Sequence, residues 1–315
     1  MALTVFIDGK EGTTGLRIFE RLATRPDLTL LTLPEEKRKD PAARKEAIHA
    51  SDIAVLCLPD AAAKESVALA EGSKARILDT STAHRIAPGW AYGFAELSTA
   101  HRNGIINGNR VAVPGCHASG FVSIVAPLTA AGLLSRDTPV SCFSLTGYSG
   151  GGKKMIAQYE GSERTPDLDA PRPYGLTQGH KHLPEMTHVP GLTVPPIFAP
   201  IVAEFYSGME VTVPLFGSQL KCAHPVEEVT ACLKAHYAGS PIMKVLGPEE
   251  VAAFGGFIPS NALSGKDGMQ LMVTGNDKRL QIVSLFDNLG KGSSGAALQC
   301  LNLMTGVSET LGLNL

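Results

Sequence analysis

The chain of 315 residues has little net charge, few cysteines and no long apolar run. Its formal charge is −2, from 28 Lys and Arg against 30 Asp and Glu, which excludes a broadly basic nucleic-acid surface. The six cysteines form no CxxC pair and no zinc-ligand spacing. No apolar segment approaches the about 18 residues that span a membrane. We therefore expect no metal, no nucleic-acid partner and no membrane partner.

We also expect no secretory leader. The chain begins Met-Ala-Leu-Thr and enters a strand pattern directly, without a basic segment followed by an apolar core. The scattered cysteines fit free thiols in a reducing compartment. We therefore expect a cytoplasmic protein. Hydrophobic residues make up 44% of the chain, which allows two domains of ordinary size.

Strand and helix patterns alternate over the first hundred or so residues. Such alternation predicts a parallel sheet with helices on both faces, as in Rossmann-type domains. The predicted strands are 3–7, 28–33, 53–58, 76–79 and 111–113, and the predicted helices are 14–23, 41–50 and 64–71.

The second half of the chain has a different pattern. Strands follow one another with few helices between them, which predicts an α+β domain with a mainly antiparallel sheet. Residues 161–178 are rich in Pro, Asp, Arg and Gly and are predicted as an ordered loop or a lid. A helix is predicted over 293–311. The other predicted elements are strands at 140–146, 194–203, 209–215, 243–246, 270–274 and 281–285, and a helix at 226–237.

Three glycines stand between the first predicted strand and the first helix. Gly9, Gly12 and Gly15 are spaced G-x-x-G-x-x-G, and Thr13 and Thr14 open the helix. The spacing departs from G-x-G-x-x-G. However, glycines at this place let the backbone approach a pyrophosphate at a helix N-terminus. The loop predicts dinucleotide binding.

The residues after the second predicted strand bear on the choice of dinucleotide. Lys37, Arg38 and Lys39 offer positive charge for a ribose 2′-phosphate, which favours NADP(H). A solvated loop is the plainer interpretation of the same three residues. Glu35 keeps NAD open, because a carboxylate at this point binds the ribose 2′-hydroxyl.

One cysteine follows a sharp turn. Val113 ends an apolar run, Pro114 and Gly115 turn the chain, and Cys116 begins a predicted helix. A cysteine in the first turn of a helix lies at the positive end of the dipole, which favours the nucleophilic thiolate. The alternative is an inert buried cysteine in a tight turn.

Six segments that run in order over nearly the whole chain point to one family. They are the Gly9–Gly15 loop, Asp79–Arg85 (DTSTAHR), Tyr92–Leu97 (YGFAEL), Pro114–Cys116, His180–Met186 (HKHLPEM) and Asn288–Ala296 (NLGKGSSGA). Together they resemble the short type of N-acetyl-gamma-glutamyl-phosphate reductase, within the aspartate-semialdehyde dehydrogenase superfamily. Glyceraldehyde-phosphate dehydrogenase is a more distant relative of the same pattern.

The resemblance implies an α/β fold of the glyceraldehyde-phosphate dehydrogenase type. A dinucleotide-binding domain over 1–115 is then completed by a C-terminal helix within 290–315. Residues 116–289 then form the catalytic, substrate and oligomerisation domain of a homo-oligomer, either a dimer or a tetramer. Asn288, Gly290 and Gly292 are expected near the nicotinamide.

The resemblance also implies a reaction. N-acetyl-glutamyl 5-phosphate is reduced with NADPH to N-acetyl-glutamate 5-semialdehyde, with release of phosphate, in arginine biosynthesis. Cys116 is expected to form a thioester, which divides a hard step into easier ones. His182 is the first choice for the acid or base and His180 the second. If 180–186 is a helix, positions two apart face different ways, so only one of the two points at Cys116.

The remaining site residues have supporting roles in this scheme. Glu185 is expected to cap a helix or to orient a histidine, and His117 is expected to point away from the reacting atoms. Arg85 is the candidate for the acyl phosphate, because a guanidinium binds phosphate oxygens bidentately. Ala83 and His84, which precede it, depart from the longer family type. Weaker substrate candidates are Ser81, Ser149 and Arg102.

Two other functions stay open. Aspartate-semialdehyde dehydrogenase, or another acyl-phosphate reductase, is the alternative within enzymes. A non-catalytic NADP-binding redox sensor that uses Cys116 as a switch is the alternative outside them.

Overall fold

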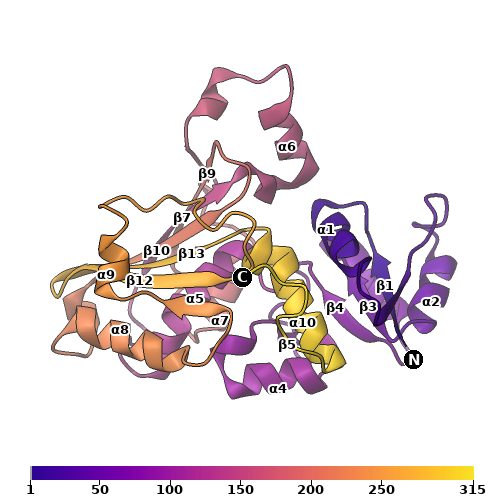
Figure 1. The fold of residues 1–315 in the computed structure, drawn as a ribbon, viewed down its shortest axis with the longest axis horizontal. Coiled ribbons are helices and arrows are strands. Elements are labelled where there is room, and N and C mark those ends of the chain that lie inside the picture. The colour runs from indigo at the N-terminus through magenta and orange to yellow at the C-terminus, as the bar shows by residue number, and fades with distance from the viewer. Residues whose placement is uncertain (1) are drawn as a thin grey trace. The chain divides into compact units, whose positions relative to one another are not determined.

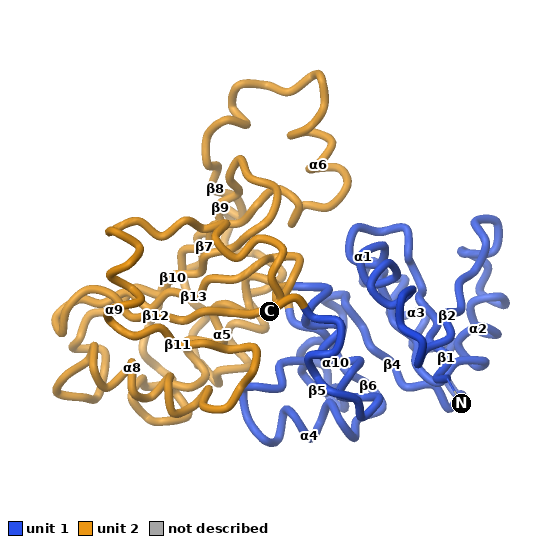
Figure 2. Tube along the Cα trace, viewed as in Figure 1, with its two compact units in different colours: residues 1–114, 293–313 blue, residues 115–292, 314–315 orange. Residues whose placement is uncertain are grey.

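The computed structural model describes residues 2–315, which form two compact units (Figure 2). Unit 1 runs to Pro114 and resumes over Ser293–Leu313, whereas unit 2 covers Gly115–Gly292 and Asn314–Leu315. The chain therefore passes between the units three times. The first passage comes directly before Cys116.

Unit 1 contains a six-stranded parallel sheet in the order β2-β1-β3-β4-β6-β5. Strands β1, β3, β4 and β5 of this sheet are labelled in Figure 1. Its central strand β3 is short, wholly apolar and buried, as expected for a sheet covered on both faces. The strands are β1 (Leu3–Asp8), β2 (Leu28–Leu31), β3 (Ile53–Leu56), β4 (Arg76–Asp79), β5 (Ala91–Tyr92) and β6 (Arg110–Ala112).

Alternate residues of β1 enter two different cores. Val5 and Ile7 pack in one cluster with Ile18 of α1 and with Leu301 of α10. Phe6 points to the other face and packs with residues of α2 and β3. Helices therefore cover both faces, which confirms the Rossmann-type prediction. The helices of this unit are α1 (Thr13–Leu22), α2 (Pro41–His49), α3 (Asp60–Leu69), α4 (Thr99–Asn107) and α10 (Gly295–Thr305).

Three predicted boundaries are wrong in an instructive way. The helix predicted over 293–311 ends at Thr305, because Gly306 adopts a left-handed conformation with φ 75° that closes the helix. The strand predicted from Val194 starts at Ile197, because Pro195 and Pro196 have no N–H to donate. Helix α3 begins at Asp60 rather than Lys64.

Unit 2 contains a seven-stranded mixed sheet in the order β11-β12-β13-β10-β7-β9-β8. Four of its neighbouring pairs are antiparallel, and β7–β9 and β11–β12 are parallel. The mainly antiparallel prediction is confirmed. The strands are β7 (Ser141–Gly147), β8 (Arg172–Pro173), β9 (Ile197–Ala203), β10 (Met209–Phe216), β11 (Met243–Val245), β12 (Met269–Asn276) and β13 (Arg279–Phe286).

Helix α5 (Cys116–Ala130) lies against this sheet and is buried along nearly its whole length. Gly120 makes the close approach feasible, because a Cβ there would lie 2.4 Å from Cγ2 of Val211 on β10. The helix that carries Cys116 is therefore held by strands β10 and β13. The other helices of the unit are α6 (Gly152–Glu160), α7 (Leu183–His188), α8 (Pro225–His236) and α9 (Pro248–Ala252).

Short elements fill the connections. The stretch 161–178 contains a 3-10 turn at Pro166–Asp169 and strand β8, so it is an ordered loop. A π-helical turn at Gly290–Ser294 precedes α10. The remaining 3-10 turns are Ala95–Leu97, Tyr148–Gly151 and Gly217–Gln219. Among residues 2–315, no helix is both long enough and apolar enough to cross a membrane.

Candidate active site

Cys116 is the first residue of α5. Gly115 before it is extended, with φ −75° and ψ 146°, and no side chain caps the helix. The positive end of the helix dipole therefore lies at Cys116, where it favours a thiolate over a thiol.

Glu185 anchors the turn that carries Cys116. Its Oε2 accepts a hydrogen bond of 3.0 Å from the backbone N–H of Gly115, and the side chain is only 2% exposed. Glu185 lies in the first turn of α7, one residue after Pro184, as the sequence predicts. The carboxylate links the start of α7 to the start of α5.

Three histidine rings gather beside this turn. The His117 ring lies 5.6 Å from His180 and 5.5 Å from His182, measured between centroids, and the latter two rings are 4.8 Å apart. The premise that 180–186 is a helix is wrong, so the argument that His180 and His182 face different ways does not apply. Helix α7 begins only at Leu183, so His180 lies in the preceding turn and its Nδ1 accepts from the N–H of His182.

His117 belongs to this cluster and contacts two hydroxyl groups. Its Nδ1 is 2.6 Å from the Ser144 hydroxyl and its Nε2 is 2.6 Å from the Tyr174 hydroxyl. Burial lowers the pKa of His117 to about 3, and the charges of His180 and Lys181 add to this effect. The pKa of His180 is lowered to about 4, mainly by burial and also by Lys181. Both imidazoles are therefore neutral near pH 7.

Neither Ser144 nor Tyr174 carried a signal in the sequence. Ser144 lies inside a strand pattern and Tyr174 inside a Pro-rich loop. Only the pairing of β8 with β9, next to β7, brings them to His117. Despite the clustered imidazoles, the described part of the chain has no group of three or more His, Cys, Asp or Glu that could hold a metal ion.

The segment after β13 lies against the same cysteine. A Cβ on Gly292 would come within 3.0 Å of the Cys116 Cβ, so only glycine fits there without displacement. Asn288 donates from Nδ2 to the Ser149 hydroxyl at 3.0 Å and accepts from the N–H of Gly208 at 2.9 Å. The structure therefore brings Ser149 to Asn288, and Gly292 to Cys116. Gly290 lies between Asn288 and Gly292 in the sequence. It packs on the carbonyl of Lys266, which a Cβ on Gly290 would approach to 2.0 Å.

The glycine loop of unit 1 fits a dinucleotide pyrophosphate. Gly9 has φ +87°, and a Cβ on Gly9 or on Gly15 would lie 2.4 Å from a backbone oxygen. Gly12 starts α1 without any side-chain cap. The buried Oγ1 of Thr13 has no hydrogen-bond partner among residues 2–315, whereas Thr14 binds Ser293 at 3.2 Å. The result is an open cradle with an unused donor at a helix N-terminus.

The two groups that bear on NADP or NAD bind each other. Arg38 and Glu35 form an ion pair of 2.6 Å on the surface of unit 1. A ribose 2′-phosphate at Arg38 would therefore compete with Glu35.

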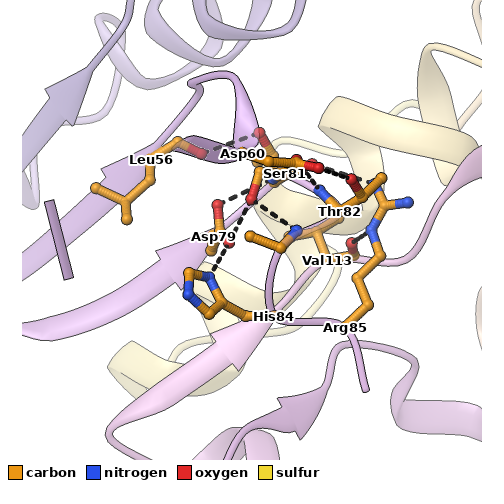
Figure 3. Close-up of polar contacts among 10 residues, drawn as sticks. Leu56, Asp60, Asp79, Ser81, Thr82, His84, Arg85 and Val113 are labelled. Atoms are coloured by element: carbon orange, nitrogen blue, oxygen red, sulfur yellow. Dashed lines mark hydrogen bonds and ion pairs between the residues drawn. The ribbon is translucent and has the colours of Figure 1, made fainter. Parts of the chain in front are cut away.

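The turn 79–85 forms a tight polar network in unit 1 (Figure 3). Asp79 is fully buried and accepts from the Ser81 hydroxyl at 2.7 Å, from the Ser81 N–H at 2.9 Å and from Nδ1 of His84 at 2.6 Å. The His84 ring stacks on Trp90 at 4.2 Å. His84 therefore belongs to the support of the turn, and Ser81 donates its hydroxyl proton to Asp79.

Arg85 closes the same turn. Its Nε donates to the carbonyl of Val113 at 2.9 Å, and one terminal nitrogen donates to the carbonyl of Thr80 at 3.2 Å. The guanidinium is thus tied to the strand end that leads to Pro114.

Arg102 is occupied elsewhere. Both of its terminal nitrogens donate to Glu309, at 2.6 and 3.2 Å, in a two-pronged ion pair within unit 1. The carboxylate of Glu309 therefore occupies the Arg102 guanidinium, which the sequence suggested for substrate binding. Arg102 therefore stays only a weak candidate for substrate binding.

The chain matches two models of known protein families. Residues 4–105 match the model described as "Semialdehyde dehydrogenase, NAD binding domain". Residues 116–288 match "Semialdehyde dehydrogenase, dimerisation domain". Solved structures with a similar fold include aspartate semialdehyde dehydrogenase II of Vibrio cholerae (TM-score 0.73, 15% identity, 97% of this chain and 99% of that chain). The enzyme of Candida albicans with NADP is also similar (TM-score 0.66, 14% identity, 97% and 99%).

Relatives with higher sequence identity define the family more narrowly. N-acetyl-gamma-glutamyl-phosphate reductases of Brucella ovis and Brucella abortus are each 48% identical over 307 residues. The match covers 96% of this chain and 98% of each relative. The chain belongs to the N-acetyl-gamma-glutamyl-phosphate reductase family.

Proposed function

We propose that this protein reduces N-acetyl-glutamyl 5-phosphate to N-acetyl-glutamate 5-semialdehyde with NADPH and releases phosphate, in arginine biosynthesis in the cytoplasm. The observation that carries the proposal is Cys116 at the start of α5, anchored by Glu185 and bordered by three imidazoles. The 48% identity to named reductases supports the substrate. In this proposal residues 1–115 and 290–315 bind the cofactor, and 116–289 carry the chemistry.

Cys116 is the proposed nucleophile. Its thiolate attacks the acyl carbon, and the tetrahedral oxyanion collapses with loss of phosphate to leave a thioester on sulfur. When bound, NADPH supplies a hydride to that carbon. The resulting thiohemiacetal then releases the aldehyde and restores the thiolate. Backbone N–H groups in the first turn of α5 stabilise the oxyanion, by about 3 kcal/mol for each donor.

His182 is the proposed acid and base. His180 is the weaker choice, because a pKa of about 4 leaves almost none of its protonated form at neutral pH. His180 instead accepts a hydrogen bond from the backbone N–H of His182 at Nδ1 of its neutral imidazole. Glu185 acts through the backbone of Gly115 and is a positioning residue.

The cofactor and substrate residues follow from the remaining geometry. The Gly9–Gly15 loop, including Gly12, with Thr13 and Thr14, is proposed to hold the pyrophosphate, and Arg38 the 2′-phosphate. Asn288, Gly290 and Gly292 are proposed to lie near the nicotinamide. Arg85 is proposed to bind the acyl phosphate and Ser149 the substrate, whereas Ser81 supports the turn that carries Arg85.

A homodimer or a tetramer is proposed through the sheet of unit 2. Phe143, Ile197 and Phe216 are 48%, 67% and 62% exposed, and the strand register places them on one face. Ile197 and Phe216 border a groove of about 620 Å³. Large apolar side chains gathered on one face are typical of an interface, and the matched dimerisation model covers these residues.

The test is an assay in the reverse direction. Enzyme, NADP, phosphate and N-acetylglutamate 5-semialdehyde should yield NADPH, read by absorbance, and Cys116→Ala should abolish it. Reduction of NADP only with aspartate semialdehyde would favour the alternative dehydrogenase. NADP binding without turnover of either aldehyde would favour a redox sensor.

A further inference from the structure

The Tyr174 ring lies beside the histidine cluster at Cys116, with its centroid 6.1 Å from that of His117 and 5.9 Å from that of His180. Tyr174 directly follows β8, and its N–H donates to the carbonyl of Pro200 on β9 at 3.0 Å, so the edge of the sheet holds its backbone. The hydroxyl has one hydrogen-bond partner within residues 2–315, Nε2 of His117. Burial and the nearby charge of Cys116 raise the pKa of Tyr174, so the phenol stays protonated at neutral pH.

The direction of the hydrogen bonds follows from the burial of Ser144. This side chain is fully buried, and its hydroxyl has His117 as its sole hydrogen-bond partner in the described part of the chain. If His117 donated to Ser144, the serine proton would have no acceptor, and a buried unsatisfied donor costs about 1–3 kcal/mol. Ser144 therefore donates to Nδ1 of His117.

The rest of the chain of bonds is then fixed. With Nδ1 as acceptor, neutral His117 carries its proton on Nε2 and donates it to the Tyr174 oxygen. The proton of Tyr174 is then left without an acceptor among residues 2–315. Tyr174 is only partly buried, so its free O–H costs little in the absence of substrate.

We propose that Tyr174 is a catalytic hydrogen-bond donor to the acyl oxygen of the Cys116-bound substrate, and that Ser144 and His117 are positioning residues that set its direction. The inference rests on the proposed function. No proton is transferred: the O–H bond of Tyr174 stays intact while the acyl oxygen gains negative charge during attack. Such a donor strengthens most in the transition state, where charge develops.

The test measures reverse-direction kinetics for the wild type, Tyr174→Phe, Ser144→Ala and the double variant. Phenylalanine keeps the ring and removes only the hydroxyl. We expect kcat of Tyr174→Phe to fall about 100-fold, the usual effect of losing one such donor, with KM and the unfolding midpoint near wild type. Tyr148→Phe is the matched control, because it removes a hydroxyl that donates to Glu160 at an exposed position. Its kcat should equal that of the wild type.

Ser144→Ala separates positioning from packing. We expect kcat to fall about 10-fold in the wild-type background and not at all in the Tyr174→Phe background, because both changes act through one hydroxyl. If the two losses in kcat are additive, Ser144 does not act through Tyr174. If Tyr174→Phe has the kcat of the wild type, Tyr174 is not a hydrogen-bond donor to the acyl oxygen. An inactive wild type would overturn the proposed function, and this inference with it.

Discussion

Replacing Gly292 with alanine should push the nucleophile out of place. The added Cβ would lie 3.0 Å from Cβ of Cys116, 3.1 Å from the carbonyl oxygen of Asp287 and 3.2 Å from the Phe286 ring. Carbon atoms pack at about 3.5–4.0 Å, so the two backbones must separate by at least about 0.5 Å. Phe286 and Asp287 are fully buried, and α5 packs against strands β10 and β13 of the sheet.

Both stability and rate follow from that displacement. Overpacking of this size costs about 1–3 kcal/mol of unfolding free energy. A misplacement of about 1 Å at a reacting centre costs about 100-fold in rate, so a loss of about 10- to 100-fold in kcat is expected here. The assay pairs kcat with the rate of Cys116 alkylation by iodoacetamide. A control is Gly247→Ala, where the new Cβ meets only ordinary contacts beyond 3.5 Å. If a folded Gly292→Ala enzyme has wild-type kcat and alkylation rate, Gly292 does not set the position of Cys116.

Three further outcomes are expected. Because the pKa of His117 falls from 6.5 to about 3 on folding, its neutral form stabilises the protein fully above pH 6.5 and progressively less as pH falls toward 3. Between pH 6.5 and 4.5 the loss is about 2 kcal/mol. The free energy of unfolding, measured by denaturant titration at several pH values, should depend less on pH in His117→Gln than in the wild type. Equal pH dependence would contradict the assignment. Glu35→Gln frees Arg38 from its 2.6 Å ion pair and should lower KM for NADPH about 2- to 5-fold without changing that for NADH. An unchanged ratio of the KM values for NADPH and NADH would mean that Arg38 does not bind the 2′-phosphate. Asn314→Ala removes an amide that donates to the Gly265 carbonyl at 2.8 Å and should cost about 1 kcal/mol in urea unfolding, whereas Leu315→Ala should cost less.

Local constraints made much of the fold predictable from the sequence. Strand β4 has the predicted bounds, because the apolar run at Ile77 and Leu78 is closed by Asp79. The glycine loop was also predictable, since the close approaches at Gly9 and Gly15 arise within one strand, turn and helix. The end of α10 was equally local, and Gly306 marks it. Helix α6 was not predictable in this way, because glycines at 150–152 favour a loop and its helical conformation depends on the surrounding structure.

The polar partners of the site were beyond local reasoning. Asn288 and Ser149 are separated by 139 residues, and Glu185 and Gly115 by 70. Periodicity assigns a residue to a face of its own element and says nothing about which other element lies opposite. Such partners depend on strand order, and the order β10-β7-β9-β8 crosses the sequence repeatedly.

His117 shows why closeness in sequence misleads. Successive residues of an α-helix project about 100° apart, so a histidine next to Cys116 was expected to leave the site. Its Nδ1 lies 2.6 Å from the Ser144 hydroxyl on β7. Tyr174 arrives from a third segment, binds His117 and lies close enough to Cys116 for the cysteine charge to raise the pKa of its phenol. Tyr174, which is 57 positions from His117 in the sequence, therefore contacts His117 and lies near Cys116. His117, expected to point away from the reacting atoms, thus holds the Tyr174 hydroxyl that we propose to act on them.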